Sequence, residues 1–302
     1  MLRALLDNPV VAASLAAAAL LQLSFYLATA MPSARRRLEA RFSPAGLASL
    51  ALAAALVPYL MYSLPAGVFQ LAALAKLAAV SAVPVFVFVV SPTRSKRLAW
   101  QDVVVLLTVG VAELGKLYRQ IYRDPLPDLR VDFLGRVMML GVLAIAYLSL
   151  RRLEGCNYQL TTARADWREG LTQFVFLLPI AVAAGVAIGF ARFDPRKADP
   201  WFWPLLAVGT FLGMYAFVAL FEELVFRGVL QNLLGPGLKA QAAASIVFGL
   251  VHLPFRQFPN WRFVMVACIA GWFYGQAWRR RGVTAAAITH ALVVTVWRLW
   301  FQ

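Results

Sequence analysis

Long stretches of apolar residues recur along the whole chain and are separated by short polar segments. About 20 consecutive apolar residues are long enough to cross the hydrocarbon core of a bilayer as a helix. About ten segments approach this length, with approximate limits 9–31, 44–64, 68–91, 101–118, 132–149, 171–190, 201–226, 240–254, 262–278 and 283–300. The pattern predicts an all-α, polytopic bundle of about ten transmembrane helices.

Composition and charge agree with this prediction. Hydrophobic residues make up 62% of the 302 residues and charged residues only 14%, whereas a soluble chain carries about 25% charged residues. The formal net charge is +15, but Arg and Lys lie in short clusters between the apolar segments and form no basic face. Such clusters orient membrane helices. The lipid bilayer is therefore an expected partner, and nucleic acid is not.

The segment Glu-Glu-Leu-Val-Phe-Arg, residues 222–227, places two adjacent carboxylates and an arginine inside an apolar stretch. Charged groups at membrane depth are costly and are candidates for a functional site. Glu223 and Arg227 stand four apart, so a helix lets them form an ion pair on one face. Glu222 is rotated by about 100° from Glu223, and we expect it to face a cavity as a general base toward water. A purely structural ion pair is the alternative interpretation of Glu223 and Arg227.

The two histidines of the chain, His252 and His290, follow in separate later apolar segments. A histidine can help to activate water or to stabilise an oxyanion, and it can also serve only as a hydrogen-bonding group between helices. Glu222, His252 and His290 could equally bind zinc and leave one position open for water. The residues alone leave two hypotheses: a glutamic-type hydrolase without a cofactor, or a zinc metalloenzyme.

Three motifs in successive helices resemble those of the CAAX protease and bacteriocin-processing (CPBP, or Abi) intramembrane proteases. They are Glu-Glu-x-x-x-Arg at 222–227, Phe-x-x-x-His at 248–252 and a final histidine at 290. The resemblance covers about residues 201–300. It implies that Glu222 and His252 activate the hydrolytic water and that His290 stabilises the oxyanion. It also implies that Glu223 and Arg227 support the catalytic groups.

The family pattern is broken at one position. Members commonly carry Asn or Asp four residues after the last histidine, and this chain has Val294 there. Half of the oxyanion site that the resemblance implies is therefore apolar. Thr289, Thr295 and Asn260 are the candidates for supplying the missing polar group.

The sequence favours an intramembrane endopeptidase that hydrolyses a peptide bond of a membrane-associated protein or peptide, in a bacterial inner membrane. The expected organisation is an N-terminal helical region of unknown role, residues 1–199, and a CPBP-like protease core, residues 200–302. A catalytically weak or inactive scaffold or immunity protein of the same fold is the alternative, which Val294 favours. A proton-coupled transporter is a third hypothesis, but no second segment mirrors the charged one as an inverted repeat would.

Overall fold

The computed structural model describes residues 7–126 and 129–301. Helices contain 75% of the residues, and within the described ranges the one β-type contact is an isolated bridge between Phe193 and Phe301. The prediction of an all-α fold is confirmed. The contacts between residues divide the chain into two compact units, Met1–Leu153 and Glu154–Gln302.

Seven helices of the described chain are long and apolar enough to cross a membrane. They are Pro9–Ala30, Pro44–Ser63, Leu71–Val90, Phe133–Leu150, Arg164–Ala187, Pro200–Leu234 and Val283–Trp300. The expected count of about ten transmembrane helices is not confirmed. Residues 101–118 and 240–254 do carry helices, but these have 15 and 13 residues, which is short of the roughly 20 needed to span.

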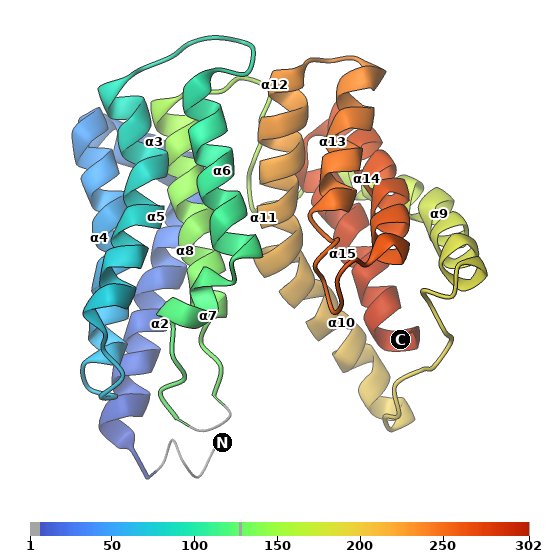
Figure 1. Ribbon diagram of the computed structural model, residues 1–302, viewed down its shortest axis with the longest axis horizontal. Helices are drawn as coiled ribbons and strands as arrows, with labels where there is room; N and C mark the ends of the chain where they lie inside the picture. The colour runs from blue at the N-terminus through green and yellow to red at the C-terminus, as the bar shows by residue number, and fades with distance from the viewer. Residues whose placement is uncertain (1–6, 127–128, 302) are drawn as a thin grey trace. The chain divides into compact units, whose positions relative to one another are not determined.

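The N-terminal unit is a bundle built around one buried helix (Figure 1). Its helices are α2 (Pro9–Ala30), α3 (Pro32–Arg41), α4 (Pro44–Ser63), α5 (Leu71–Val90), α6 (Trp100–Leu114), α7 (Leu117–Ile121), α8 (Phe133–Ala144) and the π-helical η1 (Ile145–Leu150). Almost every residue of α8 and η1 is buried. Helices α2, α4 and α5 contact this central segment, so the apolar side chains of α8 form the core of the unit.

The C-terminal unit contains one very long helical segment and three further long helices (Figure 1). Its elements are α9 (Arg164–Ala187), η2 (Pro200–Phe202), α10 (Trp203–Met214), η3 (Tyr215–Ala219), α11 (Leu220–Glu223), η4 (Leu224–Gln231), α12 (Asn232–Leu234), α13 (Leu238–Leu250), α14 (Trp261–Arg281) and α15 (Val283–Trp300). Segments η2 to α12 follow one another as a single 35-residue span. Segments η3 and η4 within it are π-helical, and π-helical turns are frequent at functional sites.

Helix α9 belongs by its contacts to the C-terminal unit, which therefore begins about 45 residues before the core expected at residue 200. A glycine explains the close packing of α9 on α15. A Cβ atom on Gly170 would lie 2.7 Å from Ile288, and Thr289 Oγ1 donates a hydrogen bond to the Gly170 carbonyl at 3.0 Å. Helix α15 is buried along its first half. It is the central element of this unit.

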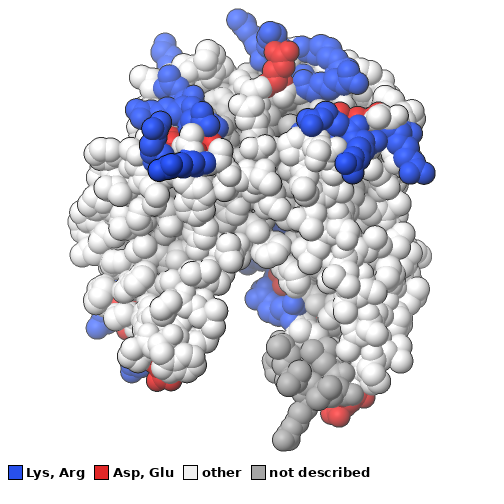
Figure 2. Space-filling model, turned by 180° about the vertical axis from the view of Figure 1, so that it is seen from behind, with Lys and Arg blue, Asp and Glu red and all other residues white. Residues whose placement is uncertain are grey.

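Lys and Arg side chains gather at one end of each unit (Figure 2). In the N-terminal unit the exposed basic residues of α3 and of the α5–α6 turn lie there. They include Arg36, Arg37, Lys96 and Arg97. In the C-terminal unit Arg279, Arg280 and Arg281 lie in the last turn of α14. Large apolar side chains are exposed along the helices, among them Leu20, Val90, Leu107 and Leu205, as expected for helices that contact lipid.

Candidate active site

The two adjacent glutamates lie at the junction between α11 and the π-helical η4. The Nε atom of Arg227 is 3.3 Å from Oε2 of Glu223, and both side chains are completely buried. The predicted ion pair between these residues is confirmed. Glu222 keeps 19% of its side chain exposed, whereas Glu223 is completely buried.

The guanidinium of Arg227 lies among aromatic rings as well as beside Glu223. Its Cζ atom is 5.1 Å from the centre of the Phe248 ring and 6.0 Å from that of Tyr274, and cation–π contacts stabilise a desolvated guanidinium. Its Nη1 and Nη2 atoms have no hydrogen-bond acceptor among the described residues. A Cβ atom on Gly271 would lie 3.2 Å from Nη2, so the glycine provides the space in which the guanidinium fits.

His290 lies between the two glutamates. Its Nδ1 atom is 2.8 Å from Oε1 of Glu223, and its Nε2 atom is 3.8 Å from Oε2 of Glu222. Tyr274 covers one face of the imidazole, with ring centres 4.6 Å apart and planes within 10° of parallel. Because a carboxylate only accepts hydrogen bonds, Nδ1 donates to Glu223 and Nε2 is the atom that faces Glu222.

His252 follows the end of α13 and lies in a mainly aromatic environment. Its Nδ1 atom is 2.7 Å from the carbonyl oxygen of Phe248, and its ring contacts the rings of Phe248 and Phe263 with centres 4.8 and 4.5 Å apart. The Phe248 ring also contacts His290, with ring centres 5.9 Å apart. Both histidines therefore border the same phenylalanine. Of the two histidines, His290 is the one whose ring nitrogens approach the glutamates in the described part of the chain.

Val294 stands where the family has a polar residue, and the three candidates for replacing that polar group all form hydrogen bonds to other partners. Thr289 donates to the carbonyls of Gly170 and Ala285, and Thr295 donates to the carbonyl of Ala291 at 2.7 Å. The side chain of Asn260 donates to the Phe255 carbonyl and accepts from the backbone N–H of Phe263, which caps α14. These bonds stabilise the helices, and none of them directs a donor toward His290.

The model of the family described as type II CAAX prenyl endopeptidase Rce1-like matches residues 201–296. Over this region the chain is Rce1-like. The match confirms the resemblance to the CPBP proteases that the motifs indicated. Comparison with curated proteins and with solved structures gave no match.

The Rce1-like match and the seven apolar helices together indicate an integral, multi-pass membrane protein with a CAAX-type endopeptidase region. The matched residues begin at the start of the long η2–α12 span and end within α15. Both glutamates, Arg227 and both histidines lie inside the match. Helix α9 packs against the Rce1-like region but precedes it.

The donor set considered for zinc is not arranged as a metal site. Across residues 7–126 and 129–301, no group of three His, Cys, Asp or Glu side chains is positioned to hold a metal ion. In each histidine Nδ1 is bonded to an acceptor, Oε1 of Glu223 or the Phe248 carbonyl, which leaves Nε2 as the nitrogen that could bind a metal. In this structure Glu222, His252 and His290 are not placed together as three ligands of one ion.

Sequence analysis missed two features of the Rce1-like site. One is the hydrogen bond between Glu223 and His290. It was not predicted because Glu223 was expected to pair with Arg227 alone, and because Glu223 and His290 lie 67 residues apart in the sequence. The other is Tyr274, whose ring stacks on His290. No motif marks Tyr274, but it is a polar aromatic residue within an apolar segment, and such a residue usually has a partner for its hydroxyl when buried.

Proposed function

We propose that the protein is an intramembrane endopeptidase that hydrolyses a peptide bond of a membrane-associated protein or peptide. The observation that carries the proposal is the position of His290 between a fully buried glutamate and a partly exposed one. The buried carboxylate of Glu223 can orient the imidazole of His290 so that its other nitrogen faces the reacting groups, as the buried acid does in catalytic triads. The match to the CAAX endopeptidase family supplies the reaction class. A bacterial inner membrane is the location that we propose.

Glu222 is proposed as the general base. Its carboxylate is the more accessible of the two, and no basic residue within its own helical turn neutralises it. In the reaction, Glu222 takes a proton from water as the water oxygen attacks the carbonyl carbon of the scissile bond. The same proton is then delivered to the departing amine as the C–N bond breaks.

His252 is proposed to assist Glu222 in holding the attacking water. A carbonyl oxygen can only accept a hydrogen bond, so Nδ1 of His252 carries the proton that faces Phe248. In the neutral ring the lone pair is then on Nε2, which can accept a hydrogen bond from water. The flanking Phe248 and Phe263 rings fix the orientation of the imidazole.

His290 is proposed to stabilise the oxyanion. This role needs a proton on Nε2 in addition to the one that Nδ1 donates to Glu223. The carboxylates of Glu223 and Glu222 together balance the positive charges of that doubly protonated ring and of Arg227. Glu223 and Arg227 therefore act through His290, as positioning residues.

A cleavage assay in lipid nanodiscs tests the proposal. The substrate is a library of membrane-anchored peptides, and products are identified by mass spectrometry. We expect Glu222→Gln to lower the turnover by about 10²- to 10⁴-fold, the usual contribution of a general base. Glu169→Gln is the matched control, because Glu169 lies in the same unit and pairs with Arg280 outside the site. Cleavage that is equal in both variants would reject the proposal and favour the inactive scaffold.

The same assay addresses the metal hypothesis. The protein is stripped with a chelator, exchanged into metal-free buffer and assayed again, with and without added zinc. Full turnover after removal of the metal supports the glutamic-type reaction. Loss of turnover that zinc restores would show that the Glu222, His252 and His290 side chains rearrange to bind it.

A further inference from the structure

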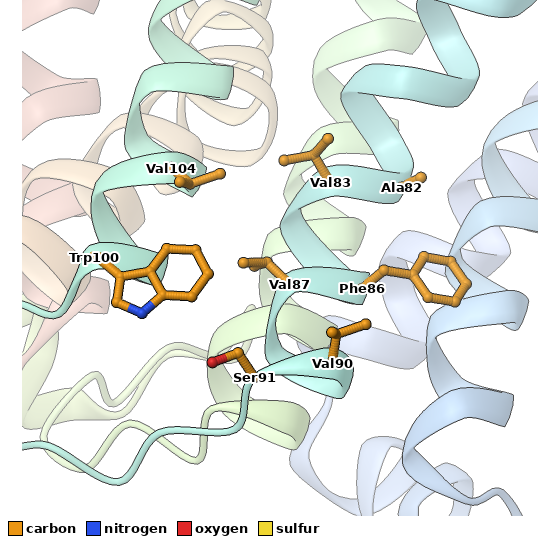
Figure 3. Close-up of a pocket in the computed structure, with 8 residues that line it drawn as sticks. All are labelled: Ala82, Val83, Phe86, Val87, Val90, Ser91, Trp100 and Val104. Carbon is orange, nitrogen blue, oxygen red and sulfur yellow. The ribbon is translucent and has the colours of Figure 1, made fainter.

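The N-terminal unit carries an apolar groove between α5 and α6 that the proposed peptidase does not use. Its volume is about 390 Å³, and its walls include Val83, Val87 and Val90 of α5 and Trp100 and Val104 of α6. Figure 3 shows Val83 and Val87 turned toward Trp100 and Val104, with Ser91 at one end. Because α5 is one of the candidate spans and Val83, Val90 and Trp100 are exposed, we expect lipid tails to contact this groove.

The end of the groove at Ser91 is a fixed polar structure. Gln101 Nε2 donates to both the backbone carbonyl and the hydroxyl oxygen of Ser91, at 3.1 and 3.0 Å. The carboxylate of Asp102 accepts from the backbone N–H of Ala99 at 2.9 Å. Since the Ser91 oxygen accepts from Gln101, its own O–H can donate to a group at the end of the groove.

A buried arginine holds the turn between α5 and α6 in place. Arg151, which is 2% exposed, donates through Nη2 to the Ser95 carbonyl at 2.6 Å and through Nη1 to the Thr93 carbonyl at 3.4 Å. The side chains of Lys96 and Arg97 are exposed on this turn. The backbone that carries these two side chains is therefore held in place before any ligand binds, which lowers part of the ordering cost of binding.

We propose that this groove and turn bind a single anionic phospholipid. One acyl chain lies along the valines and Trp100, and the headgroup phosphate lies near Lys96, Arg97 and the Ser91 hydroxyl. Two observations favour an anionic headgroup. The basic residues follow directly after a membrane span, where Lys and Arg attract anionic lipids, and Trp100 lies beside them, at the level where tryptophan prefers the interface.

Native mass spectrometry of the full chain tests the proposal. The protein is released from nanodiscs that contain equal amounts of phosphatidylglycerol and phosphatidylcholine with the same acyl chains. We expect the retained lipid to be enriched in phosphatidylglycerol by about 30-fold, since Lys96 and Arg97 each contribute about 1 kcal/mol near the surface. Lys96→Gln/Arg97→Gln lowers the enrichment to near one while a lipid is still retained.

Two matched controls separate this site from a general preference of the surface. Arg36→Gln/Arg37→Gln removes two exposed basic residues of the same unit and keeps the enrichment. Val83→Trp fills the groove and lowers retention of both lipids, whereas Leu107→Trp, on an exposed part of α6 outside the groove, does not. The proposal is wrong if wild type shows no enrichment, if enrichment survives Lys96→Gln/Arg97→Gln, or if Val83→Trp retains lipid as wild type does. None of these outcomes depends on peptidase activity.

Discussion

Among the described residues, each unit buries an arginine–carboxylate pair, and the two pairs differ in how completely their polar atoms are hydrogen-bonded. In the N-terminal unit, Arg151 donates to both oxygens of Asp102, at 3.0 and 3.3 Å. The rest of its guanidinium bonds to the carbonyls of Thr93 and Ser95. A buried ion pair is tolerated when its remaining donors and acceptors are satisfied in this way. We interpret this pair as structural.

The pair in the C-terminal unit is less complete. Arg227 approaches Glu223 at 3.3 Å, but its Nη1 and Nη2 atoms find no acceptor among the described residues. The second oxygen of Glu223 is bonded to His290 instead of the arginine. Buried polar groups left partly unsatisfied weaken a fold, and natural proteins concentrate such departures at functional sites. The comparison therefore supports a functional interpretation of Glu223 and Arg227.

Replacing both members of the incomplete pair gives the largest expected effect. Glu223→Leu/Arg227→Leu removes the acceptor that orients Nδ1 of His290, and loss of the orienting acid in a comparable arrangement lowers turnover by about 10⁴-fold. Turnover of the membrane-anchored peptides in nanodiscs measures this loss. The free energy of unfolding, measured by SDS titration in mixed micelles, should stay within about 3 kcal/mol of wild type. The gain of about 1–4 kcal/mol when a buried pair is replaced by apolar residues is offset by about 1–3 kcal/mol for Nδ1 of His290, which loses its acceptor.

The opposite result would identify this pair as structural. A fall of several kcal/mol in the unfolding free energy, with normal turnover per folded molecule, would contradict the functional interpretation. Thr295→Val on α15 serves as the control, because it removes a buried hydroxyl near the site without changing a charge.

Replacing both members of the buried pair in the N-terminal unit by leucine should lower the free energy of unfolding without changing turnover. Asp102→Leu/Arg151→Leu leaves the carbonyls of Thr93 and Ser95 and the N–H of Ala99 without their partners. At about 1–3 kcal/mol for each unsatisfied group, we expect the unfolding free energy to fall by about 3 kcal/mol or more. Turnover per folded molecule should not change, and a loss of turnover would show that this pair also serves the site.

A smaller effect is expected at Tyr274, which stacks on His290. Tyr274→Leu removes the ring, and since an aromatic pair contributes about 0.5–1.5 kcal/mol beyond its buried area, turnover should fall by about tenfold. Tyr274→Phe keeps the stacked ring and should restore turnover with an unchanged KM. If Phe and Leu lower turnover equally, the hydroxyl of Tyr274 takes part in the reaction and stacking does not explain its role.

The parts of this site that sequence analysis predicted are those set by local helix geometry. The contact between Glu223 and Arg227 follows from their spacing of four, and the π-helical winding of η4 does not break it. The bond between Glu223 and His290 depends instead on how α15 packs beside α11. No periodicity within either segment encodes that packing.

The fold shows the same limit. Apolar length correctly predicted an all-α membrane protein, because hydrophobic segments must satisfy their backbone groups as helices. It did not predict which helices are too short to span, since α13 ends after 13 residues, just before His252. Helix α9, which precedes the protease core expected at residues 200–302, packs against α14 and α15. Contacts between helices, which apolar length does not report, decide that packing.

The smallest expected effect is a gain at Val294, one helical turn after His290. Val294→Asn introduces a donor on the helix face that carries the proposed oxyanion group, where Thr289, Thr295 and Asn260 are already bonded elsewhere. A new hydrogen bond contributes about 0.5–1.5 kcal/mol, so kcat should rise by about threefold with little change in KM. Val294→Thr, of similar size, is the control, and an equal rise in both variants would show that polarity alone, without an amide donor, accounts for the gain. A fall in kcat for Val294→Asn would mean that the apolar side chain of Val294 contacts the substrate productively. The departure from the family pattern at this position would then be an adaptation to that substrate and not the loss of an oxyanion group.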